Sequence, residues 1–184
     1  AGNYSAVGRT KTAPTGDVSS LKLAIASCSS IYSGFFNAYR RIGERNDLDA
    51  MIHLGDYIYD FVDEDEEVRV PDPYPINPFT LEEWRDRHEY YLLDPDLRYA
   101  RQQHPWIHMW DNHDITGGAE LLPSIQAFNE WTPVRTGSDS TNILYRQFSF
   151  GDLLDIFMLD ILQFRDVDVI ATDEFSILGN DQYN

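Results

Sequence analysis

Ile52-His53-Leu54-Gly55-Asp56-Tyr57-Ile58-Tyr59-Asp60 is the stretch that decides the predicted fold. An apolar run from Ala50 to Leu54 ends in a glycine and a carboxylate. This order is typical of a buried strand that brings an acidic side chain to the edge of an open α/β sheet. Gly55 lets the backbone turn without a side chain in the way. Asp56 then lies at the strand tip, and Tyr59 can direct its phenol to the same place. A carboxylate and a phenol together suit a hard, highly charged metal ion such as Fe(III).

Two further strand candidates end in reactive or metal-binding residues. Residues 21–26 alternate apolar and smaller side chains and lead into Ser27-Cys28-Ser29-Ser30. Residues 104–110 lead into Asp111-Asn112-His113-Asp114. A helix predicted over residues 34–45 joins the first strand to residues 50–54. This forms a βαβ unit with parallel strands and a right-handed crossover.

The remaining pattern predicts three helices and a hairpin. Thr80 and Glu83 match a capping box that begins one helix. Asp94-Pro95 begins a second helix that runs toward residue 103. A third helix is predicted over residues 123–131. Strands over 143–150 and 153–161 flank Gly151-Asp152, which we interpret as a two-residue hairpin turn. The predicted fold class is therefore α/β, with βαβ units and a C-terminal β-hairpin.

Parallel strands bring their carboxyl ends to one edge, so the three strand tips are expected to meet. The chemistry that suits them is a two-metal hydrolytic site, in which Asp56 bridges two ions. Cys28 and Tyr59 would hold the trivalent ion, and the amide oxygen of Asn112 would hold the divalent one. His113 would not be a ligand. It would contact a phosphoryl oxygen or protonate the leaving group.

Other interpretations of these residues remain open. Cys28 can be a small buried hydrophobic residue, or a nucleophile with His113 as its base in a metal-free cysteine hydrolase. Residues 60–67 carry six acids and read as a solvated loop, with a calcium site as the alternative. A non-catalytic, truncated domain that binds calcium there is a third possible function. Asp60, Asp114 and four histidines are interpreted as structural, the histidines being His53, His88, His104 and His108.

Composition limits the classes of partner. The chain has 184 residues, with 31 acidic against 14 basic residues and a net charge of -17. Such a surface repels phosphate backbones, so binding to duplex nucleic acid is not expected. The sequence has no apolar run of the roughly 20 residues that cross a bilayer. The single cysteine cannot form an internal disulfide.

Five segments together resemble one family, the PhoD-type alkaline phosphatases of the calcineurin-like metallophosphoesterases. They are Ala26 to Cys28, His53 to Tyr59, Trp110 to Asp114, Ala127 to Arg135 and Leu144 to Asp152. The resemblance runs from Val7 to Gln182. It implies an αββα sandwich, hydrolysis of phosphodiesters and phosphomonoesters, and a centre of Fe(III) with calcium or another divalent metal. It also implies iron ligation by Cys28, Asp56 and Tyr59, Asn112 on the second metal, and export to an extracellular or periplasmic location.

The chain also departs from that family. Relatives carry an acid where Asn112 stands and an arginine near Leu162. The chain has no histidine after His113, so the family's later His-x-His cluster is missing. We expect residues 1–20 to be an irregular lead-in from the end of a preceding domain. Residues 21–184 are expected to be the N-terminal half of the catalytic domain, completed by a second chain or fragment.

Overall fold

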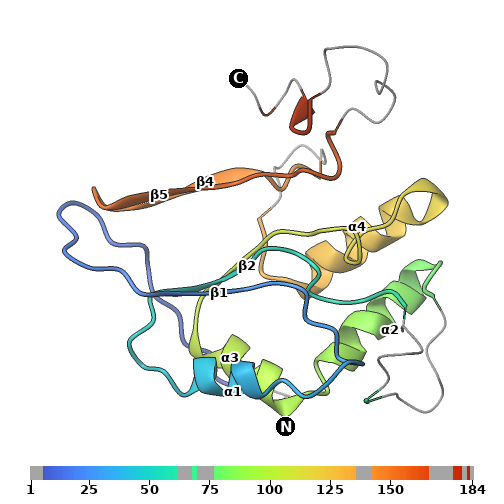
Figure 1. Cartoon of the computed structure of the whole chain (residues 1–184), viewed down its shortest axis with the longest axis horizontal. Helices are drawn as coiled ribbons and strands as arrows, with labels where there is room; N and C mark the ends of the chain where they lie inside the picture. Colours follow the sequence, from blue (N-terminus) through green and yellow to red (C-terminus); the bar gives the residue numbers. More distant parts are fainter. Residues whose placement is uncertain are drawn as a thin grey trace, which may run out of the picture.

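The structure is a computed structural model that describes residues 6–61, 68–69, 77–135, 142–165, 176–179 and 182. Its centre is a parallel sheet of three strands in the order β1-β2-β3. Figure 1 shows β1 and β2 at the middle of the molecule. The strands are β1 (Leu23–Ala26), β2 (Ala50–His53) and β3 (Trp106–His108). The helices are α1 (Asn37–Gly43), α2 (Leu81–Tyr91), α3 (Pro95–Gln103), the 3-10 helix η2 (Gly118–Glu120) and α4 (Leu121–Trp131). The chain continues into the antiparallel hairpin of β4 (Arg146–Phe150) and β5 (Leu154–Met158).

Side chains of the central strand alternate between two hydrophobic cores. Met51 faces a core built with α1, α2 and α3, whereas Ala50 and Ile52 face a core built with α4 and the hairpin. Figure 1 shows α1 and α3 on one side of the sheet and the hairpin on the other. The hairpin contributes Phe150 and Met158, both nearly fully buried, to the second core. This arrangement confirms an α/β protein with a parallel sheet and a separate antiparallel hairpin.

Local sequence signals set the helix starts. The Thr80 side chain accepts from the backbone N–H of Glu83, and the Glu83 carboxylate accepts from the backbone N–H of Thr80 at 2.8 Å. Asp94 caps α3 by accepting from the N–H groups of Asp96 and Leu97, both at 2.9 Å. Both predicted caps are confirmed, because each satisfies N–H groups that have no partner inside the helix.

Several predicted boundaries were too wide. The helix predicted over residues 34–45 spans only Asn37–Gly43, and the strands predicted over 143–150 and 153–161 shorten to β4 and β5. The two-residue turn is wrong, since Phe150 pairs with Leu154 and leaves three residues in the loop. Gly151 has a positive φ of 57°, and its N–H donates to the carbonyl of Pro14. The loop is therefore held against the lead-in segment, which allows the longer connection.

The buried histidines are packing residues, as predicted. His53, His88 and His108 are each at most 1% exposed, and His104 is 5% exposed. None of the described helices is both long and apolar enough to cross a lipid bilayer. The acids at 63–67 lie outside the described residues, so the loop and calcium interpretations of that run stay predictions. The division into residues 1–20 and 21–184 and the handedness of the crossover also stay predictions.

Candidate metal centre

The ends of β1 and β2 turn in the same unusual way. Cys28 and Asp56 have left-handed backbone angles, with φ of 56° and 52°, and neither is glycine. Such a conformation is costly for a residue with a Cβ, so it is maintained only where the surroundings fix it. The N–H of Cys28 donates to the carbonyl of Gly55 at 3.1 Å, and that of Ser29 donates to the carbonyl of Asp56 at 2.9 Å. The two strand tips are thereby tied together, with both side chains on the same edge.

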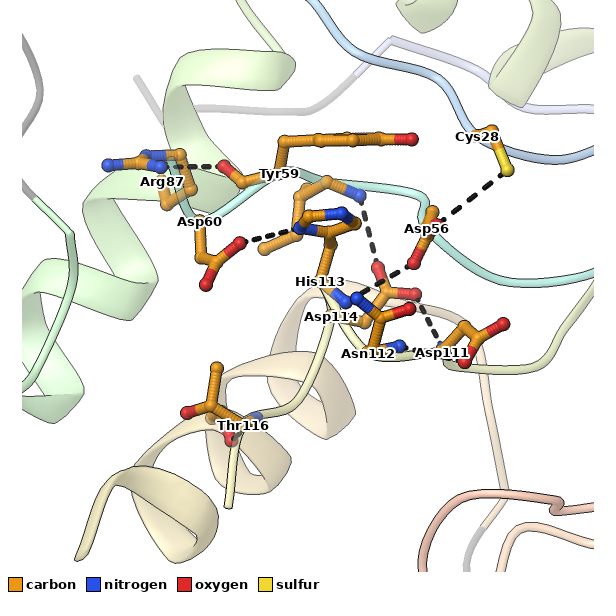
Figure 2. A network of polar contacts seen from close by, with 12 residues as sticks. Cys28, Asp56, Tyr59, Asp60, Arg87, Asp111, Asn112, His113, Asp114 and Thr116 are labelled. Carbon is orange, nitrogen blue, oxygen red and sulfur yellow. Dashed lines mark hydrogen bonds and ion pairs between the residues drawn. The ribbon is translucent and has the colours of Figure 1, made fainter. Parts of the chain in front are cut away.

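Three acidic donor groups converge at this edge. The Cys28 thiol donates to Oδ2 of Asp56, with sulfur and oxygen 3.6 Å apart. Figure 2 shows the Tyr59 ring extended toward Cys28, with its hydroxyl directed to the same edge. Burial raises the pKa of Tyr59, and the negative charge of Asp56 raises it further. The structure therefore brings these three residues together from two strand ends.

His113 lies beside this group with a fixed orientation. Its ring stacks on the Tyr59 ring at 4.1 Å between centroids and 22° between planes. Its Nδ1 lies 2.7 Å from Oδ1 of Asp60, and Figure 2 marks this contact with a dashed line. Because an ionised carboxylate can only accept, Nδ1 carries the proton. The bond to Asp60 is the main reason that the pKa of His113 is raised, and nearby Asp56 adds to it.

A buried carboxylate joins the second and third strand tips. Oδ1 of Asp114 accepts from the N–H groups of Tyr57 and Ile58 at 2.9 and 3.0 Å, and Oδ2 accepts from Asp111 at 3.0 Å. Burial raises the pKa of Asp114 to about 7, against the lowering effect of these backbone donors. The N–H of His113 also donates to Oδ1 of Asp56 at 3.2 Å. Asp114 therefore has the structural role that was predicted: it joins the loop after β2 to the loop after β3.

Asn112 is the exposed member of the third strand tip. Its backbone N–H donates to Oδ1 of Asp111 at 2.9 Å, whereas its side-chain amide bonds to no other described residue. Figure 2 places the Asn112 side chain between Asp111 and His113. Burial raises the pKa of Asp111. The Asn112 amide oxygen is therefore available as a ligand at the same edge as Asp56.

The donor set fits a trivalent cation such as Fe(III), which accepts thiolate as well as carboxylate and phenolate ligands. A thiol, a carboxylate and a phenol lie together, and no Lys or Arg of the described chain forms an ion pair with Asp56. All three groups become anions on losing a proton, so a bound cation would offset their mutual repulsion. Within the described residues, no three His, Cys, Asp or Glu side chains cluster as a metal site. The fit therefore depends on the tyrosine. Asn112 and the shared Asp56 are the predicted donors for a second ion.

The geometry does not favour a cysteine nucleophile. A base that activates a thiol must accept its proton. The Cys28 thiol donates to Asp56, and the contacts of the described residues include none between Cys28 and His113. The neighbouring carboxylate and phenol oppose a free thiolate rather than stabilise it. Cys28 is also exposed, which contradicts a role as a buried hydrophobic residue.

Sequence reasoning missed the partnership of Asp60 with His113. In the sequence, Asp60 begins the acidic run that continues at 63–67. Its side chain, however, is only 16% exposed and pairs with His113. The position directly after Tyr59 was the available signal, since a turn that returns Tyr59 to the edge also brings the next residue close. Arg87 was missed too. It donates to the carbonyl oxygen of Tyr59 at 2.6 Å and so braces the same turn.

Known proteins resemble this chain in both sequence and fold. A family model described as PhoD-like phosphatase matches residues 23–117 and 122–184. The chain is 33% identical, over 188 aligned positions, to alkaline phosphatase D of Bacillus subtilis (strain 168), an alignment that covers 88% of this chain and 32% of that protein. A solved structure described as the structure of PhoD aligns with a TM-score of 0.82 and 29% identity, covering 95% of this chain and 40% of the other. The chain thus spans about a third of the length of the curated relative.

Proposed function

The chain belongs to the PhoD-like phosphatase family, and from this premise we propose that it forms the first part of a dinuclear metallophosphoesterase. The proposed reaction is hydrolysis of phosphomonoesters and phosphodiesters. The observation that supports it most is the convergence of Cys28, Asp56 and Tyr59, with thiol and carboxylate 3.6 Å apart at the carboxyl edge of the parallel sheet. Open α/β sheets bind their ligands at this edge.

The proposed ligands divide between two ions. Cys28, Asp56 and Tyr59 would hold Fe(III), because thiolate, carboxylate and phenolate donors neutralise a trivalent charge. Asp56 would be shared with calcium or another divalent metal, which the amide oxygen of Asn112 would also hold. When bound, such a pair of metals activates a water molecule and offsets charge on the attacking and leaving oxygens. The protein's own task is to fix these donors, which the strand-tip hydrogen bonds do.

His113 is the proposed catalytic residue. Its Nδ1–H is held by Asp60, so its other ring nitrogen, Nε2, is the atom left to face a substrate. The stack with Tyr59 keeps the ring beside the proposed metal ligands. Because the contact with Asp60 raises the pKa of His113, the imidazolium form persists to higher pH and can donate a proton. His113 would thus hydrogen-bond a phosphoryl oxygen or protonate the departing alkoxide.

We propose that further ligands come from a polypeptide segment outside these 184 residues. Four protein ligands shared by two ions leave coordination positions to be filled, and the chain spans 32% of its curated relative. Size-exclusion chromatography with metal analysis tests this. A stable iron-loaded monomer of 21.3 kDa with full activity would contradict it. We also propose that the protein acts outside the cytoplasm, which cell fractionation checks.

The function itself is tested by metal content and hydrolysis together. The natural protein, purified without chelator, is expected to contain iron and calcium and to hydrolyse a nitrophenyl phosphate ester. Removal of the metals should abolish hydrolysis, and resupply of Fe(III) and calcium should restore it. A cysteine hydrolase would keep its activity in chelator, so unchanged turnover in the metal-free protein would sink the proposal.

A further inference from the structure

A shallow groove continues from the candidate metal centre toward α1. It has a volume of about 520 Å³ and runs between the end of β1 and the first turn of α1. Cys28 and Tyr59 form part of its wall, so the groove and the proposed metal site share two residues. Ser27, Ser30 and Phe35 lie along it as well. A substrate whose phosphate occupied the metal centre would have its organic group within reach of this groove.

We propose that this groove binds the organic group of the phosphate ester and selects an uncharged group with a flat apolar face, with Phe35 as the specificity-determining residue. The inference rests on the proposed function, because it takes the phosphate to lie at the metal centre. The occupant is therefore a small molecule, such as an aryl ester group, rather than a polypeptide.

The charge of the lining supports an uncharged occupant. Of the described residues that line the groove, none is Asp, Glu, Lys, Arg or His. This is unusual for a chain with a net charge of -17. A charged ester group would lose hydration there without gaining an ion pair. A neutral group would lose little, and serine hydroxyls can hydrogen-bond its polar atoms.

Phe35 supplies the apolar surface. Its side chain is 65% exposed, and it lies two residues before the start of α1. The guanidinium of Arg69 lies 5.2 Å from its ring centroid, and Arg69 is held in turn by Asp94 at 2.7 Å. Asp94 is itself 4% exposed and caps α3, so its side chain is held in place. Asp94 therefore holds Arg69, and Arg69 in turn packs against the Phe35 ring. An aromatic ring held in place binds a flat group with less loss of side-chain entropy.

The test compares esters that differ only in the group the groove would hold. Phenyl, methyl and 2-aminoethyl phosphate each carry a single organic group, and the phosphate released measures their hydrolysis. With the metal-loaded natural protein, we expect the KM of the phenyl ester to be about tenfold lower than that of the methyl ester. The 2-aminoethyl ester should gain no such advantage, although the overall negative charge of the protein would favour it. Calorimetric binding of phenylphosphonate and methylphosphonate gives a second measurement that needs no turnover.

Two variants and one control test whether the groove causes the preference for the phenyl ester. Phe35→Ser should remove the tenfold preference in both KM and binding. Ala38→Phe, which adds bulk to the groove wall on α1, should remove it by filling the space. Phe157→Ser is the matched control, since Phe157 is 64% exposed on β5 and lies away from the groove. It should keep the preference.

The outcomes separate this inference from the proposed function. Hydrolysis without a phenyl preference overturns the groove assignment and leaves the phosphoesterase intact. A preference that survives both Phe35→Ser and Ala38→Phe overturns it as well. If no ester is hydrolysed and neither phosphonate binds, the proposed function fails and this inference fails with it.

Discussion

The Sγ atom of Cys28 lies 3.6 Å from Oδ2 of Asp56, although 28 positions separate the two residues in sequence. Both have left-handed backbone angles that a glycine would adopt more easily. The backbone is therefore strained at the two strand tips where a thiol and a carboxylate come into contact. Strain of this kind is a feature of binding and catalytic sites.

Replacing Cys28 by glycine should separate strain from ligation. Cys28→Gly is expected to raise the free energy of unfolding of the metal-free protein by about 1 kcal/mol, because glycine tolerates a φ of 56°. The same variant should lose iron. Ser27→Gly is the control, since Ser27 has no positive φ and the change should lower stability slightly. Urea unfolding and elemental analysis measure both effects. Destabilisation by Cys28→Gly would show that the backbone there is not strained.

Tyr59→Phe tests the phenol as a metal ligand. The variant removes the phenol hydroxyl and retains the ring that stacks on His113. We expect loss of the visible absorption band of an Fe(III)–phenolate bond and a lower iron content, with unchanged folding. Tyr99→Phe, at an exposed tyrosine of α3, should leave the spectrum unchanged. An intact band in Tyr59→Phe would exclude Tyr59 from the iron site.

Asp60→Asn tests how the orientation of His113 is maintained. The contact with Asp60 is the main cause of the raised pKa of His113, so its loss should lower that pKa. If the imidazolium form is the active one, the alkaline limb of the pH–kcat profile should move to lower pH. We also expect about a tenfold lower kcat with little change in KM. An NMR titration of the imidazole measures the pKa independently of activity. A profile identical to that of the unmodified protein would contradict this role, and Asp155→Asn on β5 is the exposed control.

Asp114→Asn tests the carboxylate that joins two strand tips. Asparagine can keep one oxygen toward Tyr57 and Ile58, but its amide N–H groups then face the N–H of Asp111. A buried donor without an acceptor should lower the free energy of unfolding by about 2–4 kcal/mol. Denaturant unfolding of the metal-free protein measures the loss. A loss below that of an exposed substitution such as Asp152→Asn would mean that the loops are held by other contacts.

The strand tips were predictable from sequence because their signals are local. Strand β2 is nine-tenths or more buried at every position, and the glycine and acid that follow mark its end. Parallel pairing then fixes which edge Cys28 and Asp56 share. The Asp60–His113 contact was missed, because its one signal, the position directly after Tyr59, does not show which partner the turn brings to Asp60. The end of β5 was missed because Leu159 and Ile161 continue the apolar pattern but are 43% and 49% exposed. These two apolar residues lie beyond the paired part of the strand, because pairing ends where Arg146 faces Met158.

Three buried histidines should make the fold sensitive to acid. Burial lowers the pKa of His53 and of His88 to about 3, and it lowers that of His108 well below its ordinary value of 6.5. Their neutral forms are stable in the fold, whereas the unfolded chain takes up protons below pH 6.5. The unfolded state therefore binds more protons between about pH 6.5 and pH 3. Stability should be fully present above pH 6.5 and fall as the pH is lowered through that window.

His88→Phe isolates one of these contributions. The His88 ring lies parallel to Trp131 with 6.4 Å between centroids, and neither ring nitrogen has a hydrogen-bond partner. Phenylalanine keeps an aromatic ring there, removes two unsatisfied polar atoms and cannot be protonated. We expect a higher free energy of unfolding at pH 5 and a shallower dependence on pH, measured by urea unfolding of the metal-free protein between pH 4 and pH 7. Phe128→Leu, in contact with the same ring, should lower stability equally at every pH, because it changes packing alone. An unchanged pH slope in His88→Phe would mean that His88 takes up its proton equally in the folded and unfolded states.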